Sequence, residues 1–219
     1  MSGFAPAFDA AQKPMPGHLI KAVERNDIEA VKGFLRRGVE LDKHDNWGRA
    51  ALRVAAERGY MEIAHLLIAA GADINQKSDS GLTQLMGLVQ GDDAEAVRRL
   101  IDLGADVHIK EEHGWTALTF AAVWAENPDI IRVLIEKGAK INVPDHNNET
   151  PLTLAARYHK TENEQALKEG LELRTERELE RQQREEKRRK EAAEKRRHDA
   201  VVLKQRKLRA RIPAVKGPE

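Results

Sequence analysis

The sequence contains no cysteine, which excludes a disulfide framework, a zinc site with cysteine ligands and a cysteine nucleophile. Aromatic residues make up only 4% of its 219 residues, whereas 33% are charged. One compact globule of this composition would have a thin core. A stack of repeats needs only small apolar residues between neighbours, and the alanine- and leucine-rich usage fits such a stack.

Long apolar runs are also missing: none approaches the roughly 20 residues of a membrane-spanning helix. The first residues, MSGFAPAFDAAQKPMPG, lack the basic start and apolar run of a secretory signal. There is no phosphate-binding loop, no Gly-x-Ser-x-Gly and no His-Glu-x-x-His motif. We therefore expect no enzyme activity, no cofactor, no metal and no membrane partner. We expect a cytoplasmic location, or a nuclear one if the host is eukaryotic.

The stretch from 45 to 77, DNWGRAALRVAAERGYMEIAHLLIAAGADINQK, contains two apolar stripes at helical spacing. Gly59 separates the stripes. Gly71 follows the second stripe, where the end of a helix favours a residue that tolerates the left-handed region. The pattern predicts a unit of helix, turn, helix and loop about 33 residues long.

This unit recurs along the chain. Gly38, Gly71 and Gly104 are 33 residues apart, and Gly138 follows 34 residues later. A second row in the same register comprises Leu52, Leu85, Leu118 and Leu152. The pattern resembles the ankyrin repeat, and Thr150-Pro151-Leu152 matches that family's Thr-Pro-Leu. The resemblance implies an all-α fold, an ankyrin-repeat solenoid, here followed by an extended single α-helix.

The register of the repeats predicts the domain boundaries. We expect a flexible N-terminal arm at 1–15, an N-terminal capping repeat at 16–44, repeats at 45–77, 78–110 and 111–144, a degenerate C-terminal repeat at 145–170, a long charged helix at 171–212 and a tail at 213–219.

Charge divides the chain between an acidic body and a basic C-terminal segment. Residues 171–219 carry 17 Lys and Arg against 10 Asp and Glu, a net charge of +7, whereas the remainder has a net charge of −6. Pairs such as Glu180–Arg184 and Glu186–Lys190 have the favourable order for i,i+4 ion pairs. The apolar a and d positions of a coiled coil are missing. We therefore expect a single solvent-exposed helix.

Three interpretations of this helix stay open. It is a spacer ending in a docking segment for a second protein partner, a nucleic-acid-binding helix, or a solvated tail. The docking segment would present Val201, Leu208 and Ile212. Interleaved glutamates lower the charge density, and no aromatic residue follows Tyr158 to stack on bases. We therefore favour the spacer over nucleic-acid binding.

Members of the ankyrin family bind other proteins through a concave groove, formed by the hairpin tips and the exposed face of the inner helices. The resemblance carries this groove over, position by position, to a set of candidate partner-binding residues. They are Asn46, Trp47, Arg49, Arg58, Asp79, Leu82, Glu112, His113, Trp115, Trp124, His146, Glu149, Arg157 and Tyr158.

All three tryptophans and one of the two tyrosines fall in this set. A core role would place them at the apolar stack positions, which Leu, Ile, Val and Ala occupy. Trp and Tyr are enriched at binding hot spots, so we expect a binding role, and we expect Trp115 and Trp124 to matter little for stability. The alternative is that one or more of these rings lies flat on its neighbour and shields the turn.

The sequence therefore predicts a protein-interaction adaptor or scaffold. A partner protein binds in the groove, and the C-terminal helix reaches a second partner or subunit. The alternative is a nucleic-acid-associated or ribonucleoprotein assembly factor that uses the basic helix.

Overall fold

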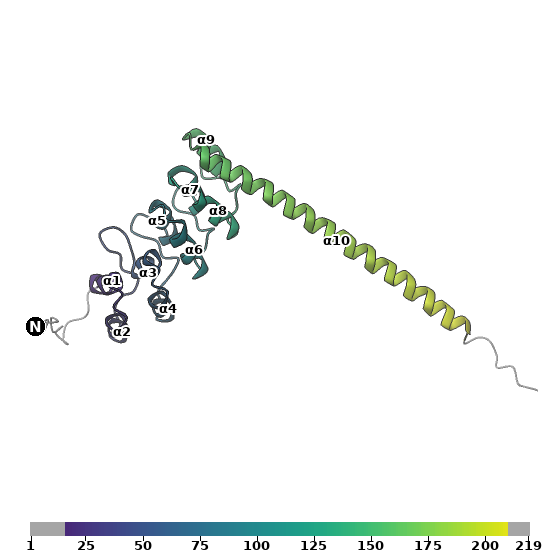
Figure 1. Ribbon diagram of the computed structural model, residues 1–219, viewed down its shortest axis with the longest axis horizontal. Helices are drawn as coiled ribbons and strands as arrows, with labels where there is room; N and C mark the ends of the chain where they lie inside the picture. The colour runs from purple at the N-terminus through teal and green to yellow at the C-terminus, as the bar shows by residue number, and fades with distance from the viewer. Residues whose placement is uncertain (1–15, 210–219) are drawn as a thin grey trace, which may run out of the picture. The chain divides into compact units, whose positions relative to one another are not determined.

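The computed structural model describes residues 16–209, with side chains described for 17–196. The chain divides between Gly170 and Leu171 into two units (Figure 1). The first unit contains α1 (Pro16–Glu24), α2 (Ile28–Arg36), α3 (Ala51–Arg58), α4 (Met61–Ala69), α5 (Gln84–Gln90), α6 (Ala94–Asp102), α7 (Ala117–Trp124), α8 (Asp129–Glu136) and α9 (Pro151–Arg157). Helix α10 (Thr161–Arg209) begins in the first unit and continues through the second.

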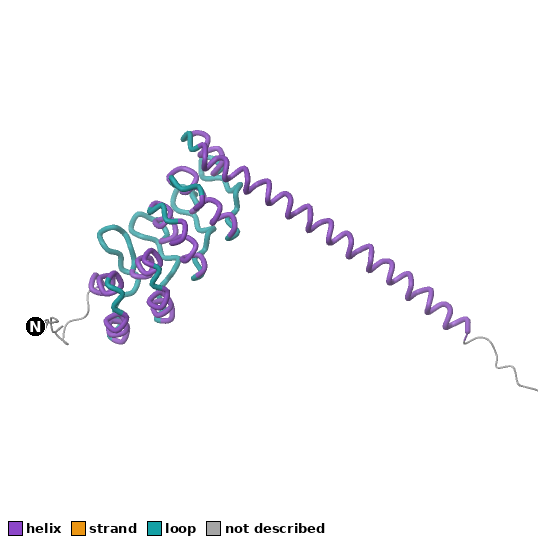
Figure 2. Tube along the Cα trace, in the orientation of Figure 1, coloured by secondary structure: helices purple, strands orange, loops and turns teal. Residues whose placement is uncertain are grey.

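Helices in the first unit come in consecutive pairs joined by short turns, and the pairs stack on one another (Figures 1 and 2). The inner helices α1, α3, α5, α7 and α9 pack in that order, and the outer helices α2, α4, α6 and α8 pack behind them. Among the described residues the ordered elements are helices, with one isolated β-bridge between Lys77 and Thr83. The predicted all-α repeat solenoid, followed by a long helix, is confirmed.

Two rows of leucine and glycine produce the repeat register, as predicted. Leu52, Leu85 and Leu118 are buried between inner helices. Leu152 occupies the same register but is only half-buried, because α9 is the last inner helix and has an inner neighbour on one side only. The predicted turn position Asn148 has a φ of 62°, in the left-handed region where the other repeats have glycine.

Capping at the starts of α7 and α9 follows from their threonines. Thr116 and Thr150 precede α7 and α9, and each forms a capping box with the threonine three residues later. Pro151 then occupies the first turn of α9, where its missing N–H is tolerated. Thr119 and Thr153 occupy the position where the ankyrin family has histidine, and here they cap helices instead.

Gly87 lies inside α5, where glycine destabilises a helix by ~1 kcal/mol relative to alanine. The structure explains its presence through Arg53 of the preceding repeat. The Arg53 guanidinium occupies the space that a Cβ at Gly87 would need, and it donates to the Gly87 carbonyl oxygen at 2.8 Å. Arg53 thereby links two neighbouring inner helices.

The first turns of α10 complete the last repeat. Asn163 is buried, and its Nδ2 donates to the carbonyl oxygens of Ala121, Ala122 and Ala125 at the end of α7, the last at 2.8 Å. Gly170 permits a close approach, because a Cβ there would lie 2.4 Å from the Cδ1 of Ile135. Residues 161–170 therefore pack where the outer helix of this repeat is expected.

In the second unit, α10 is exposed along the described side chains from 172 to 196. None of the described helices is both long and apolar enough to cross a bilayer. The predicted N-terminal arm lies outside the described residues. So do Ile212 and the tail, as well as the side chains of Val201 and Leu208, so the docking-segment prediction remains untested.

Candidate functional site

Three hairpin tips are tight turns, each organised by the carboxylate of its first residue. In the tip at 45–49, the Asp45 carboxylate accepts the backbone N–H groups of Trp47 at 2.9 Å and Arg49 at 3.0 Å. Glu111 and Asp145 accept the equivalent backbone N–H groups in their own tips. The candidate groove residues on these tips are therefore presented on a fixed backbone.

These hydrogen bonds also set the ionisation of the tip carboxylates. Burial pushes the pKa of Asp45 and of Glu111 upward, but the hydrogen bonds each carboxylate accepts outweigh burial and hold the pKa below its ordinary value. In Asp145 the backbone N–H of Glu149 is the largest cause of a lowered pKa. Each carboxylate is thus held in its charged form, which is the form that accepts the turn's N–H groups.

Consecutive tips contact one another along the stack. The backbone N–H of His146 donates to the carbonyl oxygen of His113 at 3.0 Å. The His146 ring lies over Gly114, where a Cβ would come within 2.8 Å of the imidazole. Gly114 also has a φ of 87°, so both its conformation and this contact favour glycine. The tips at 111–115 and 145–149 therefore contact each other directly.

The predicted groove residues differ in how much surface they offer. Trp47, Trp124 and Tyr158 are 75%, 56% and 50% exposed. Among the described residues of the first unit, these three are the only large hydrophobic side chains that are exposed. The exposed polar members are Asn46, Arg58, Asp79, Glu112, His113, His146 and Arg157, whereas Leu82 is half-buried.

Trp115 differs from the other two tryptophans. It is half-buried, its indole Nε1–H donates to Asp145 Oδ2 of the next tip at 3.0 Å, and its ring packs edge-on against Phe120 at 5.4 Å. Trp115 therefore connects two repeats, and we expect it to contribute to stability, whereas the sequence alone predicted that it would matter little. Its ring also lines a surface hollow together with Trp124.

Arg49 and Glu149 also take part in structural ion pairs. The Arg49 guanidinium contacts Glu24 and Asp45, both at 2.8 Å, and it lies 5.0 Å from the centre of the Trp47 ring. Glu149 pairs with Arg157. Arg49 thus holds Trp47 by a cation–π contact and ties α1 to the first tip.

A surface hollow of about 350 Å³ lies between the third and fourth repeats. We call it the aromatic hollow, and it is lined by Gln90, Glu111, His113, Trp115, Phe120 and Trp124. Trp115 and Trp124 come from different parts of the repeat, the tip and the end of the inner helix. The predicted set thus contains three members of this hollow, Trp115, Trp124 and His113, which the structure brings together.

The predicted set lacks the other three residues that line the hollow, Gln90, Phe120 and Glu111. Phe120 is buried in α7 and was indistinguishable from a core residue, although its spacing of four from Trp124 places the two on one face of the helix. Glu111 holds the tip, and its second oxygen lies 2.9 Å from His113 Nδ1. That contact raises the pKa of His113, because the carboxylate stabilises the protonated ring.

The stacked helix pairs with protruding tips define a repeat solenoid. The chain matches the family described as Ankyrin repeats (3 copies) over residues 16–78 and 85–176. It belongs to the ankyrin-repeat family. No curated protein matches the chain.

Proposed function

We propose that this chain is an adaptor whose concave groove binds a partner protein. Ankyrin repeats generally mediate protein–protein interaction and are typically not enzymes. One observation carries the proposal further. The exposed large hydrophobic side chains of the described first unit, Trp47, Trp124 and Tyr158, all belong to the predicted groove set. Exposed aromatic residues of this kind are the usual anchors of binding energy.

The aromatic hollow is the proposed anchoring point. Its lining is mainly aromatic, and the Trp115 ring is held in place by Asp145 and Phe120. A wall that is already ordered loses little side-chain entropy when a ligand binds. We expect a large apolar side chain of the partner to enter this hollow, with Trp124 forming part of its wall.

The second half of the proposal concerns α10. Its exposed, charged segment in the second unit has no counterpart in the repeat body and provides a separate surface for another ligand. Two separate binding surfaces on one chain would make it an adaptor.

The test compares capture of a partner from a lysate of the source cells by three full-length proteins. They are the parent chain, the groove variant Trp124→Ala/Tyr158→Ala, and a control, Glu62→Ala/His65→Ala, with both exposed changes on the outer helix α4. Capture is performed at high salt with nuclease. We expect one protein to be retained by the parent and the control and lost by the groove variant.

Circular dichroism and thermal melting establish that all three proteins are equally folded. Loss of the captured protein from the α4 control, with retention by the groove variant, would place the binding surface on the outer helices and refute the groove. No protein retained by the folded parent at high salt would also refute it.

A further inference from the structure

Five arginines share one face of α10 in the second unit. Arg174, Arg177, Arg181, Arg184 and Arg188 follow one another at spacings of 3, 4, 3 and 4 residues, and all are exposed. With 3.6 residues per turn, their directions fall within a sector of roughly 80° around the helix. We call this set the arginine stripe, and at 1.5 Å per residue it is about 21 Å long.

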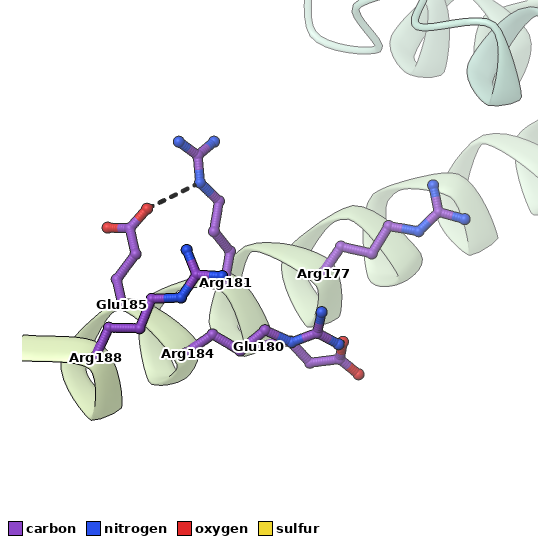
Figure 3. Close-up of a pocket in the computed structure, with 6 residues that line it drawn as sticks. All are labelled: Arg177, Glu180, Arg181, Arg184, Glu185 and Arg188. Carbon is purple, nitrogen blue, oxygen red and sulfur yellow. Dashed lines mark hydrogen bonds and ion pairs between the residues drawn. The ribbon is translucent and has the colours of Figure 1, made fainter. Parts of the chain in front are cut away.

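The winding of the helix separates the stripe from most of the glutamates that interrupt it in sequence. Between 174 and 188, all the carboxylates point outside the sector, and the nearest are Glu185 and Glu180 on either flank. They pair with Arg181 at 3.1 Å and Arg184 at 3.4 Å. Figure 3 shows these residues with Arg177 and Arg188, and together the six line a shallow hollow of about 380 Å³.

The flanking pairs are exposed on both sides, so each contributes little to stability and is readily exchanged for another anion. Arg177 and Arg188 have no ion-pair partner among the described residues. The interleaved glutamates therefore lower the charge of this face less than the sequence suggests, since they pair with only two of its five arginines.

The chemistry of the stripe favours phosphate over a protein surface. The buried core of a protein interface is depleted of charged residues, whereas the sector from 174 to 188 contains only arginine. Interfaces with nucleic acid are more polar and much more positively charged. Guanidinium groups bind phosphate oxygens in a bidentate manner. With no aromatic residue after Tyr158, the contacts would be to the backbone and not to the bases.

The shape of the element favours double-stranded DNA. α10 is one uninterrupted helix with no proline, and its only glycine, Gly170, precedes the stripe. A helix of this kind fits the major groove of B-form DNA, which is about 12 Å wide, whereas the major groove of duplex RNA is deep and narrow. A helix lying along that groove would meet the phosphates of one strand with one face.

We propose that the arginine stripe binds the phosphate backbone of double-stranded DNA without reading its sequence. This DNA would be the second ligand of the adaptor, and its binding is independent of the groove. Five phosphate contacts predict a slope of about −4.5 for log affinity against log salt concentration. A fourfold rise in salt should then weaken binding roughly 500-fold.

The experiment measures binding of full-length protein to a fluorescent DNA duplex of arbitrary sequence over a range of salt concentrations. The stripe variant is Arg177→Gln/Arg184→Gln/Arg188→Gln. The matched control is Lys187→Gln/Arg189→Gln/Lys190→Gln, which removes the same charge from other faces of the same helix. Because glutamine is a good helix former, both variants should keep the helix, as circular dichroism will show.

Loss of three phosphate contacts should make the slope of log affinity against log salt concentration about 2.7 less steep in the stripe variant. The same fourfold rise in salt should then weaken its binding to DNA only roughly 12-fold. The control should retain nearly the parent slope. Equal loss in both variants, or no binding by the parent, would overturn the proposal. So would equal competition by polyglutamate at matched charge, which would indicate an acidic protein, or tighter binding to an RNA duplex. Retained partner capture by the stripe variant separates this result from the groove test.

Discussion

Replacing the two tryptophans of the aromatic hollow separately should distinguish a residue that ties repeats together from one that only binds. Trp115→Ala removes the indole hydrogen bond to Asp145 and the edge contact with Phe120. A hydrogen bond to a charged group contributes about 1.5–3 kcal/mol, and an aromatic pair adds about 0.5–1.5 kcal/mol. Asp145 still accepts two backbone N–H groups, so we expect a loss of roughly 2–3 kcal/mol.

Trp124→Ala should change stability far less, because its ring is more than half exposed. Surface changes of this kind usually stay within about 0.5 kcal/mol. Trp115→Phe separates the two contributions: it keeps a ring against Phe120 and loses the N–H donor, so an intermediate loss of about 1–2 kcal/mol is expected.

The assay is urea unfolding followed by far-ultraviolet circular dichroism, with thermal melting as a second measurement. Trp115 couples the fourth repeat to the fifth through Asp145, and repeat proteins are stabilised by such nearest-neighbour interfaces. The unfolding midpoint should therefore fall in the order Trp124→Ala, Trp115→Phe, Trp115→Ala. If Trp115→Ala unfolds at the same midpoint as the parent, the proposed bridge to Asp145 contributes nothing and the reasoning fails.

Two further predictions concern the last repeat and the rim of the hollow. Asn163→Ala should lower the stability of the C-terminal repeat by about 1–3 kcal/mol, because three carbonyl oxygens at the end of α7 lose a buried donor. The control Gln165→Ala, on the exposed side of the same turn, should leave that stability unchanged. Faster hydrogen exchange of the α7 amides in Asn163→Ala would show this loss of stability, and unchanged protection of these amides would contradict the prediction. The Glu111 carboxylate raises the pKa of His113, so the contact stabilises the fold fully below the unfolded pKa of histidine and is lost as pH rises through the folded value. The difference in melting temperature between the parent and His113→Gln should thus shrink from acid to alkaline pH, and a difference that grows would reverse the assigned sign.

Much of the fold could be predicted because it depends on neighbours in sequence. Helices, turns and left-handed positions repeat every 33 or 34 residues, and each repeat contacts only the next. Leu52, Leu85 and Leu118 are buried for this reason, and Asn148 takes the conformation that its place in the turn predicts. The predicted groove positions follow from the same register.

What each groove residue does was decided by tertiary contacts that no local pattern encodes. The sequence predicted the same binding role for Trp115 and Trp124, but only Trp115 reaches a carboxylate 30 residues away. Likewise, Gly87 is a helix-weakening residue in sequence, and the guanidinium of Arg53, 34 residues away, explains it. Register determines which residues meet a neighbour, because it depends on spacing alone. Whether a ring is held or left exposed depends on donors and acceptors across the stack, which only the folded chain brings within hydrogen-bonding distance.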